Sequence, residues 1–287
     1  MKILVFGKTG QVAKELQALA SADLQIEALS RAEADLLDSA ACAALIAQTD
    51  ADAVINAAAY TAVDQAETEA DAAQTINADA PGAMAKAAAE RGLPFLHIST
   101  DYVFDGAGQG ARAPDDPTAP INIYGRTKLA GEDNVRAADG PHVILRTSWV
   151  FSAHGANFVK TMLRLSETRD ALTIVADQHG GPTSAADIAA TLVAMARGLM
   201  DGKTGGTYHY SGAPSTTWAD FAREIFHIAN RPVTVTDIPS TDFPTPAERP
   251  LNSRLDCATL LSDFGITPAD WKAGLTRVIA QLEQGTS

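Results

Sequence analysis

Tyr124 and Lys128 have the spacing that places two side chains on one face of a helix. A phenol there can donate a proton, and a nearby ammonium lowers the pKa of the phenol from its usual value of about 10. Thr100 ends an apolar segment upstream and adds a hydroxyl that can hold a carbonyl oxygen, a role for which Ser99 competes. Together these groups could protonate a carbonyl oxygen during reduction by a nicotinamide. We therefore predict that Thr100, Tyr124 and Lys128 are catalytic, although a Tyr–Lys pair alone is also typical of an exposed helix.

The stretch from Gly7 to Ala13 (GKTGQVA) follows an apolar segment and opens a helical pattern. Its glycines allow a tight turn close to a pyrophosphate, and a helix N-terminus favours that negative charge. Ala13 is small enough to replace the usual third glycine, although Gly7 and Gly10 could also be simple turn residues. The pattern predicts a dinucleotide site, with cofactor contacts from Gly7, Thr9, Gly10, Gln11 and Val12.

The end of the second predicted strand should contact the adenosine ribose, and it reads Ser30-Arg31. A basic residue there accommodates the phosphate of NADP, so we favour NADPH and keep NADH as the alternative. Arg31 could instead be a solvated surface cation. The remaining predicted cofactor contacts follow the second and third strands, together with the catalytic pair: Ser30, Arg31, Asp35, Leu36, Ala57, Ala58, Ala59, Tyr60, Tyr124 and Lys128.

Apolar segments and helical patterns alternate along the first half of the chain, which predicts a parallel sheet with helices on both faces. We expect strands at 3–6, 24–29, 53–56, 94–98 and 142–146. We expect helices at 11–20, 39–48, 71–91, 127–137, 157–166 and 187–200. The segment between Pro232 and Pro250 is expected to be an ordered loop over a site, because Arg249 and Arg254 lie at its end.

These elements predict an α/β fold, with a Rossmann-type doubly wound parallel sheet and a smaller C-terminal α/β substrate-binding domain. The dinucleotide-binding domain is expected to comprise residues 1–150 plus about 183–200. The substrate-binding region is expected at about 151–182 and 201–287.

Composition limits the function classes. The net charge of −13 over 287 residues argues against a nucleic-acid binder. No apolar run approaches the roughly 20 residues of a membrane span. Cys42 and Cys257 make neither a disulfide framework nor a metal quartet. A reduced, cytoplasmic setting is therefore expected.

Seven stretches occur in order along nearly the whole chain and resemble the dTDP-4-dehydrorhamnose reductase family, in the extended short-chain dehydrogenase/reductase superfamily. They are GKTGQV (7–12), NAAAYTAVDQAE (56–67), STDYVFDG (99–106), RTSWVF (146–151), NFVKTML (157–163), DQHGGPT (177–183) and RPLNSRLD (249–256).

The resemblance implies NAD(P)H-dependent reduction of the C4 keto group of dTDP-4-dehydro-L-rhamnose to dTDP-L-rhamnose, the last step of activated rhamnose synthesis for cell-wall polysaccharide. It assigns catalysis to the same three residues, Thr100, Tyr124 and Lys128. It also implies a nucleotide-sugar substrate and is compatible with a homodimer. The substrate-binding residues that it suggests are Val63, Thr100, Asp101, Tyr124, Trp149, Asn157, Arg249 and Asn252.

Some members of the family are reported to use magnesium at a dimer contact, and Glu15 matches one such position. Asp187 and Gln281 replace the other acidic positions, so Glu15 is only a weak candidate and no metal site is predicted. Two other functions stay open: a reductase or epimerase of another nucleotide-4-keto sugar, and a non-catalytic regulatory subunit of the methionine adenosyltransferase type.

Overall fold

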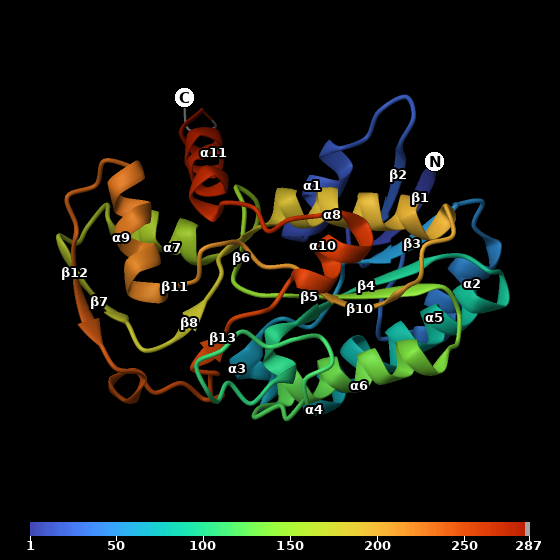
Figure 1. The fold of residues 1–287 in the computed structure, drawn as a ribbon, viewed down its shortest axis with the longest axis horizontal. Helices are drawn as coiled ribbons and strands as arrows, with labels where there is room; N and C mark the ends of the chain where they lie inside the picture. The colour runs from blue at the N-terminus through green and yellow to red at the C-terminus, as the bar shows by residue number, and fades with distance from the viewer. Residues whose placement is uncertain (285–287) are drawn as a thin grey trace.

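A six-stranded parallel sheet with the order β10-β5-β4-β3-β1-β2 forms the centre of the larger lobe (Figure 1). The computed structural model describes residues 1–284. The strands are β1 (Lys2–Phe6), β2 (Gln25–Leu29), β3 (Ala53–Asn56), β4 (Phe95–Thr100), β5 (His142–Thr147) and β10 (Gly206–His209).

Helices cover both faces of this sheet because the strands are apolar on both sides. In β1, Ile3 and Val5 join the core under α1 (Gln11–Ala18) and α8 (Ala185–Met200). Leu4 and Phe6 point to the opposite face, which is covered by α2 (Ser39–Gln48), α5 (Ala80–Glu90) and α6 (Ile123–Ala137) (Figure 1). The fold is therefore α/β with a doubly wound parallel sheet, as predicted.

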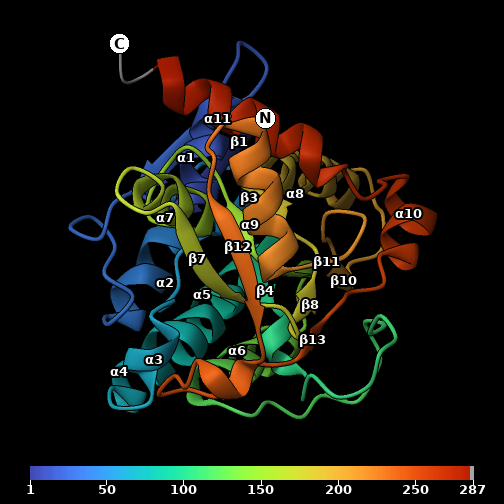
Figure 2. The same ribbon diagram turned by 90° about the vertical axis from the view of Figure 1, so that its left-hand side faces the viewer.

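The smaller lobe has its own apolar core, in which aromatic side chains are prominent. Helices α7 (Phe158–Leu165), α9 (Trp218–Ile228) and α11 (Trp271–Gln284) pack beside a parallel pair, β7 (Ala171–Val175) and β12 (Thr234–Ile238) (Figures 1 and 2). Short elements complete the chain: α3 (Val63–Ala66), α4 (Ala70–Gln74), a π-helical turn (Thr75–Asp79), α10 (Ala258–Phe264), β6 (Val150–Phe151), β8 (His179–Gly180), β9 (Thr183–Ser184), β11 (Thr216–Thr217), β13 (Asn252–Ser253) and two 3₁₀ turns (Asp101–Val103, Ser240–Asp242).

The structure differs from the expected elements at three places that matter for the site. Helix α6 begins at Ile123 rather than at residue 127, because the Asn122 side chain caps it by accepting from Gly125 N at 2.8 Å. Tyr124 therefore lies in the first turn. The helix expected at 71–91 contains the π-helical turn, where Asn77 turns its side chain to the backbone of Tyr60.

The Pro-rich segment 232–250 is not a loop throughout, because residues 234–238 form β12. Four of its five residues are β-branched, a type that favours strands, and β12 pairs in parallel with β7. The edge strand β10 comes from the part of the chain assigned to the substrate-binding region, and the domain division stays a prediction.

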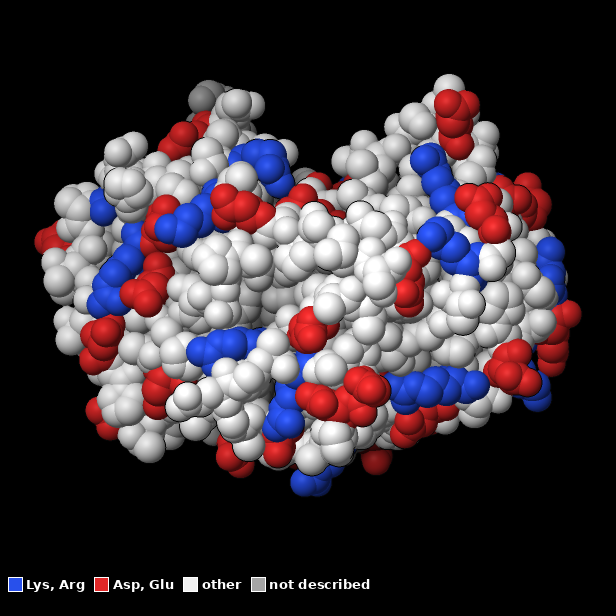
Figure 3. Space-filling model, viewed as in Figure 1, with Lys and Arg blue, Asp and Glu red and all other residues white. Residues whose placement is uncertain are grey.

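Within residues 1–284, no helix combines the length and the apolar character needed to cross a membrane. Basic and acidic side chains are interspersed over the face in Figure 3, which carries no continuous basic surface.

Candidate active site

A cleft of about 810 Å³ lies along the carboxyl ends of the parallel strands and continues to the smaller lobe. Ligands of open α/β sheets bind at this edge. The predicted residues that line it are Gly7, Thr9, Gly10, Gln11, Val12, Arg31, Asp35, Leu36, Ala57, Ala58, Ala59, Val63, Thr100, Asp101, Tyr124, Lys128 and Trp149.

The turn after β1 leaves space that fits a dinucleotide backbone. Gly7 has a φ of +99°, and a Cβ there would lie 3.3 Å from Ala57 and Ala58, so the turn needs glycine. Helix α1 starts after Gly10 without a side-chain cap. The free N–H groups of its first turn therefore face the cleft as donors for a pyrophosphate.

The end of β2 combines a cation with two acidic side chains. The Arg31 side chain is 75% exposed, and its Nε donates to Asp35 Oδ2 at 3.2 Å. Ser30, which does not line the cleft, donates from its N and Oγ to Glu33 Oε2 at 2.8 and 2.6 Å. Glu33 was not predicted from the sequence, although its position three residues after Ser30 could have indicated this contact.

Three residues that were expected to contact the cofactor or the substrate make hydrogen bonds within the protein. Tyr60 donates its hydroxyl to Glu69 Oε2 at 2.8 Å and does not line the cleft. Asn157 caps α7 and donates to Gln11 Oε1 at 2.9 Å. Asn252 is buried and donates to Gly110 O at 2.8 Å.

Arg249 also lies outside the cleft lining, where its Nη2 is 2.9 Å from Asp64 Oδ1. Its charge nevertheless acts on Tyr102, which does line the cleft. The Arg249 side chain is 21% exposed, so it is not sealed from solvent.

Thr100 and Tyr124 line the cleft together. Burial raises the pKa of Tyr124 to about 12, and the Thr100 hydroxyl opposes that rise only in part. The lowered pKa that the sequence suggested is therefore wrong, because loss of hydration outweighs any effect of the nearby ammonium. The phenol is protonated at neutral pH and is available as a proton donor.

Lys128 is fully buried one helical turn after Tyr124. Its Nζ donates to Ile98 O at 2.7 Å and lies 3.1 Å from His97 Nε2. Burial lowers the pKa of Lys128 to about 8, while the Glu132 carboxylate acts in the opposite direction. Its ammonium can therefore lose a proton close to neutral pH.

The Asp101 side chain lies buried beside Thr100. Its Oδ1 accepts from Thr100 Oγ1 at 3.1 Å, whereas its Oδ2 is buried without a hydrogen-bond partner. Burial raises the pKa of Asp101 to about 6. A buried acceptor of this kind is suited to a ligand hydroxyl.

Trp149 forms the wall of the cleft on the side of the smaller lobe. Its backbone has a φ of +50°, unusual for a bulky residue, and its ring stacks on Trp218 with centroids 3.7 Å apart. Gly180 is needed behind it, because a Cβ there would come within 2.6 Å of the indole.

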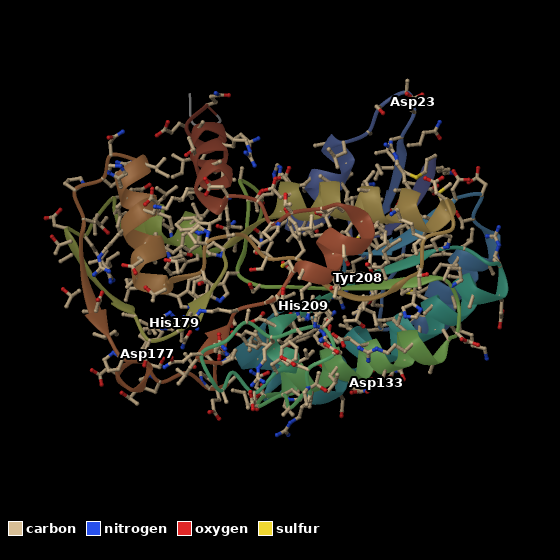
Figure 4. All side chains as sticks on the ribbon, in the orientation of Figure 1. Asp23, Asp133, Asp177, His179, Tyr208 and His209 are labelled. Carbon is tan, nitrogen blue, oxygen red and sulfur yellow. The ribbon has the colours of Figure 1, made fainter. Side chains whose placement is uncertain are left out.

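Trp218 and Tyr102 are cleft residues that the sequence analysis missed. Trp218 Nε1 donates to Gln178 Oε1 at 3.1 Å, and Gln178 in turn donates to Ser240 Oγ at 3.0 Å. Asp177 holds the same serine, near His179 at the lower end of the smaller lobe (Figure 4). Only the tertiary fold brings Trp218 to the cleft, whereas Tyr102 lies within the STDY stretch and could have been included.

The magnesium candidate Glu15 gains no support. Its side chain is 12% exposed and lies 3.9 Å from His154 Nε2, and Asp187 pairs with Arg277. In the part of the chain that the structure describes, no three His, Cys, Asp or Glu side chains form a group that could hold a metal ion.

Comparison with known proteins shows which family and which proteins this chain resembles. The family profile for the RmlD substrate binding domain matches residues 1–284. A dTDP-4-dehydrorhamnose reductase of Sinorhizobium fredii is 44% identical over 289 residues, covering 98% of both chains.

Two solved structures are similar over almost the full length. A dTDP-4-dehydrorhamnose reductase of Clostridium acetobutylicum has a TM-score of 0.92 at 37% identity, covering 99% of this chain and 100% of that one. The enzyme of that name from Bacillus anthracis, solved in complex with NADP, has a TM-score of 0.91 at 34% identity, covering 98% and 99%.

Proposed function

The chain belongs to the dTDP-4-dehydrorhamnose reductase family, and from this premise we propose that it reduces the C4 keto group of dTDP-4-dehydro-L-rhamnose to dTDP-L-rhamnose. The observation that carries the proposal is that Thr100, Tyr124 and the buried Lys128 line one cleft, with Tyr124 and Lys128 one helical turn apart. A non-catalytic regulatory subunit would not need these three groups together.

A bound nicotinamide dinucleotide supplies the hydride for this reaction. Tyr124 gives its phenolic proton to the sugar oxygen, and Thr100 holds that oxygen through its hydroxyl. The buried ammonium of Lys128 favours the phenolate that Tyr124 leaves behind. Asp101, which lines the cleft beside Thr100, is the proposed acceptor for a sugar hydroxyl. The Trp149 ring and Val63 exclude water from the reacting carbon.

The substrate diphosphate carries two negative charges that need a partner. Arg249 is the candidate, because a guanidinium can contact two phosphate oxygens at once. To bind them, it would exchange its contact with Asp64. Asn157 caps α7 and Asn252 holds the backbone of Gly110, so both act on the substrate only indirectly.

NADPH is the proposed cofactor. The Bacillus anthracis relative was solved with NADP, and Arg31 lines the part of the cleft beside β2. The family function implies a cytoplasmic protein, with Cys42 and Cys257 both unpaired and buried.

We expect Arg31→Ala to raise the KM for NADPH about tenfold, the loss of roughly one charge-assisted hydrogen bond. The KM for NADH should stay the same, since NADH lacks the phosphate. Steady-state kinetics with both cofactors measure this. An equal change in both KM values would show that Arg31 does not bind the phosphate that distinguishes NADPH from NADH.

The function is tested by following NADPH and NADH consumption with dTDP-4-dehydro-L-rhamnose and identifying the product by NMR. The proposal predicts stoichiometric dTDP-L-rhamnose. Recovery of a 4-keto sugar with inverted configuration at C3 or C5, without net cofactor consumption, would instead support the epimerase alternative. A folded, NADPH-binding protein that does not turn over this sugar would contradict the substrate assignment.

A further inference from the structure

A chain of buried polar groups leads from the backbone after β3 to Lys128. Asn56 Oδ1 accepts from Ala58 N at 3.2 Å, and Asn56 Nδ2 lies 3.2 Å from His97 Nδ1. His97 Nε2 lies 3.1 Å from Lys128 Nζ. Asn56, His97 and Lys128 are each at most 1% exposed, so this contact is sealed from solvent.

The donor and acceptor roles in this hydrogen-bonded series follow from Ala58, because a backbone N–H can only donate. The Ala58 N–H turns the amide oxygen of Asn56 toward itself, and the NH₂ group of Asn56 consequently faces His97 Nδ1. A neutral imidazole with an acceptor at Nδ1 carries its proton on Nε2. That N–H points at Lys128 Nζ, which can then accept it only as a free amine.

The other groups around Lys128 do not reverse this direction. On its own helix, Glu132 favours the ammonium, but Arg146 and Arg136 already bind both of its oxygens, and Ser99 of β4 donates to it as well. Tyr124 is a neutral phenol.

The remaining neighbours belong to β4 and the residue that follows it. Ile98 O takes one N–H of Lys128, which an amine supplies as well as an ammonium does. Thr100 is neutral, and its hydroxyl donates to Asp101.

We propose that Asn56 and His97 are positioning residues that act through Lys128, by presenting an imidazole N–H to its Nζ and so opposing its ammonium form. Lys128 can then give a proton to the phenolate that Tyr124 leaves behind and, near neutral pH, take one back through the cleft that it lines. The role in turnover rests on the reductase function proposed above, whereas the hydrogen-bond direction does not.

The ionisation of both partners agrees with this arrangement. Burial and the charge of Lys128 hold the pKa of His97 well below its usual range, so the ring stays neutral and keeps a single N–H. Burial lowers the pKa of Lys128 to about 8 against the opposing charge of Glu132, and the donor from His97 acts in the same direction as burial.

Asn56→Asp reverses the donor and acceptor roles in this hydrogen-bonded series while keeping the shape of the side chain. The carboxylate still accepts from Ala58 N but can no longer donate to His97, which should move its proton to Nδ1 and offer Nε2 as an acceptor. The ammonium of Lys128 is then stabilised. Since the reaction needs that ammonium, activity falls as pH rises through its pKa, and the alkaline limb of kcat/KM should move up by about one pH unit. Asn77→Asp is the matched control, because Asn77 is equally buried but bonds to Tyr60 and Thr127.

The ring proton can be located directly by ¹⁵N NMR of histidine-labelled protein without substrate, with His97 assigned as the signal absent from His97→Gln. We expect a protonated Nε2 and an unprotonated Nδ1 in the unmodified protein. A proton on Nδ1 would overturn the proposal, as would an alkaline limb that does not move in folded Asn56→Asp or that moves equally in Asn77→Asp. If Asn56→Asp does not fold, the spectrum alone decides. Because the spectrum needs no turnover, failure of the substrate assignment would be seen separately.

Discussion

Tyr124→Phe is expected to lower kcat with dTDP-4-dehydro-L-rhamnose by about 10²- to 10⁴-fold, the usual contribution of a positioned general acid. The substitution removes only the phenolic hydroxyl, whose proton the sugar oxygen takes up, and it leaves the ring in place. NADPH affinity should change little, and titration of NADPH fluorescence can establish this. Steady-state kinetics at neutral pH measure the loss.

Tyr102→Phe is the matched control for this experiment. Its ring packs edge-on against Tyr124, with centroids 5.5 Å apart, and it lines the same cleft. The loss should be far smaller, because Tyr102 does not contact Thr100 through its hydroxyl. If Tyr102→Phe removes more activity than Tyr124→Phe, the proton donor has been assigned to the wrong phenol.

Arg146→Met is expected to lower the free energy of unfolding by about 3–5 kcal/mol, because it leaves the Glu132 carboxylate buried without its main partner. The Arg146 side chain is 2% exposed, and its Nε and Nη2 donate to the two Glu132 oxygens at 2.8 and 2.7 Å. Urea denaturation measures the effect. Glu132 lies one turn after Lys128 on α6 and Arg146 comes from β5, so the pair ties the helix that holds the catalytic residues to the sheet.

Arg277→Met provides the comparison at the surface. Its side chain is 56% exposed and pairs with Asp187 at 3.2 Å, so the expected loss is below about 1 kcal/mol. The double variant Glu132→Gln, Arg146→Met should lose less stability than the sum of the two single variants, since no unpaired charge remains. Equal losses for Arg146→Met and Arg277→Met would show that the buried pair has no special role.

The strands of the larger lobe could be predicted because each is a short apolar run next to a helical pattern. The edge strand β10 could not, since its four residues carry no run of this kind and it forms only by pairing with β5. β12 has only Val235 and Ile238 as apolar residues, three positions apart, and it lies among prolines, so its sequence favoured a loop. Helix α6 was expected to start too late, because the capping role of Asn122 depends on a loop conformation that local pattern does not show.

The candidate site followed a similar division. Gly7, Thr100, Tyr124 and Trp149 lie in contiguous stretches with a recognisable pattern, and all four line the cleft. Trp218 comes from a distant helix, so only the fold could place it there. The pKa of Tyr124 was misjudged, because spacing reveals the neighbouring charge but not the loss of hydration.

The central claim is that this chain transfers hydride from a nicotinamide to the sugar C4, and isotope transfer tests it most directly. NADPH deuterated at the transferable position of nicotinamide C4 is incubated with dTDP-4-dehydro-L-rhamnose, and the product is examined by NMR and mass spectrometry. The account predicts one deuterium on C4 of dTDP-L-rhamnose, with Tyr124→Phe giving the same label at a much lower rate. Unlabelled dTDP-L-rhamnose, or deuterium at another sugar carbon, would contradict it.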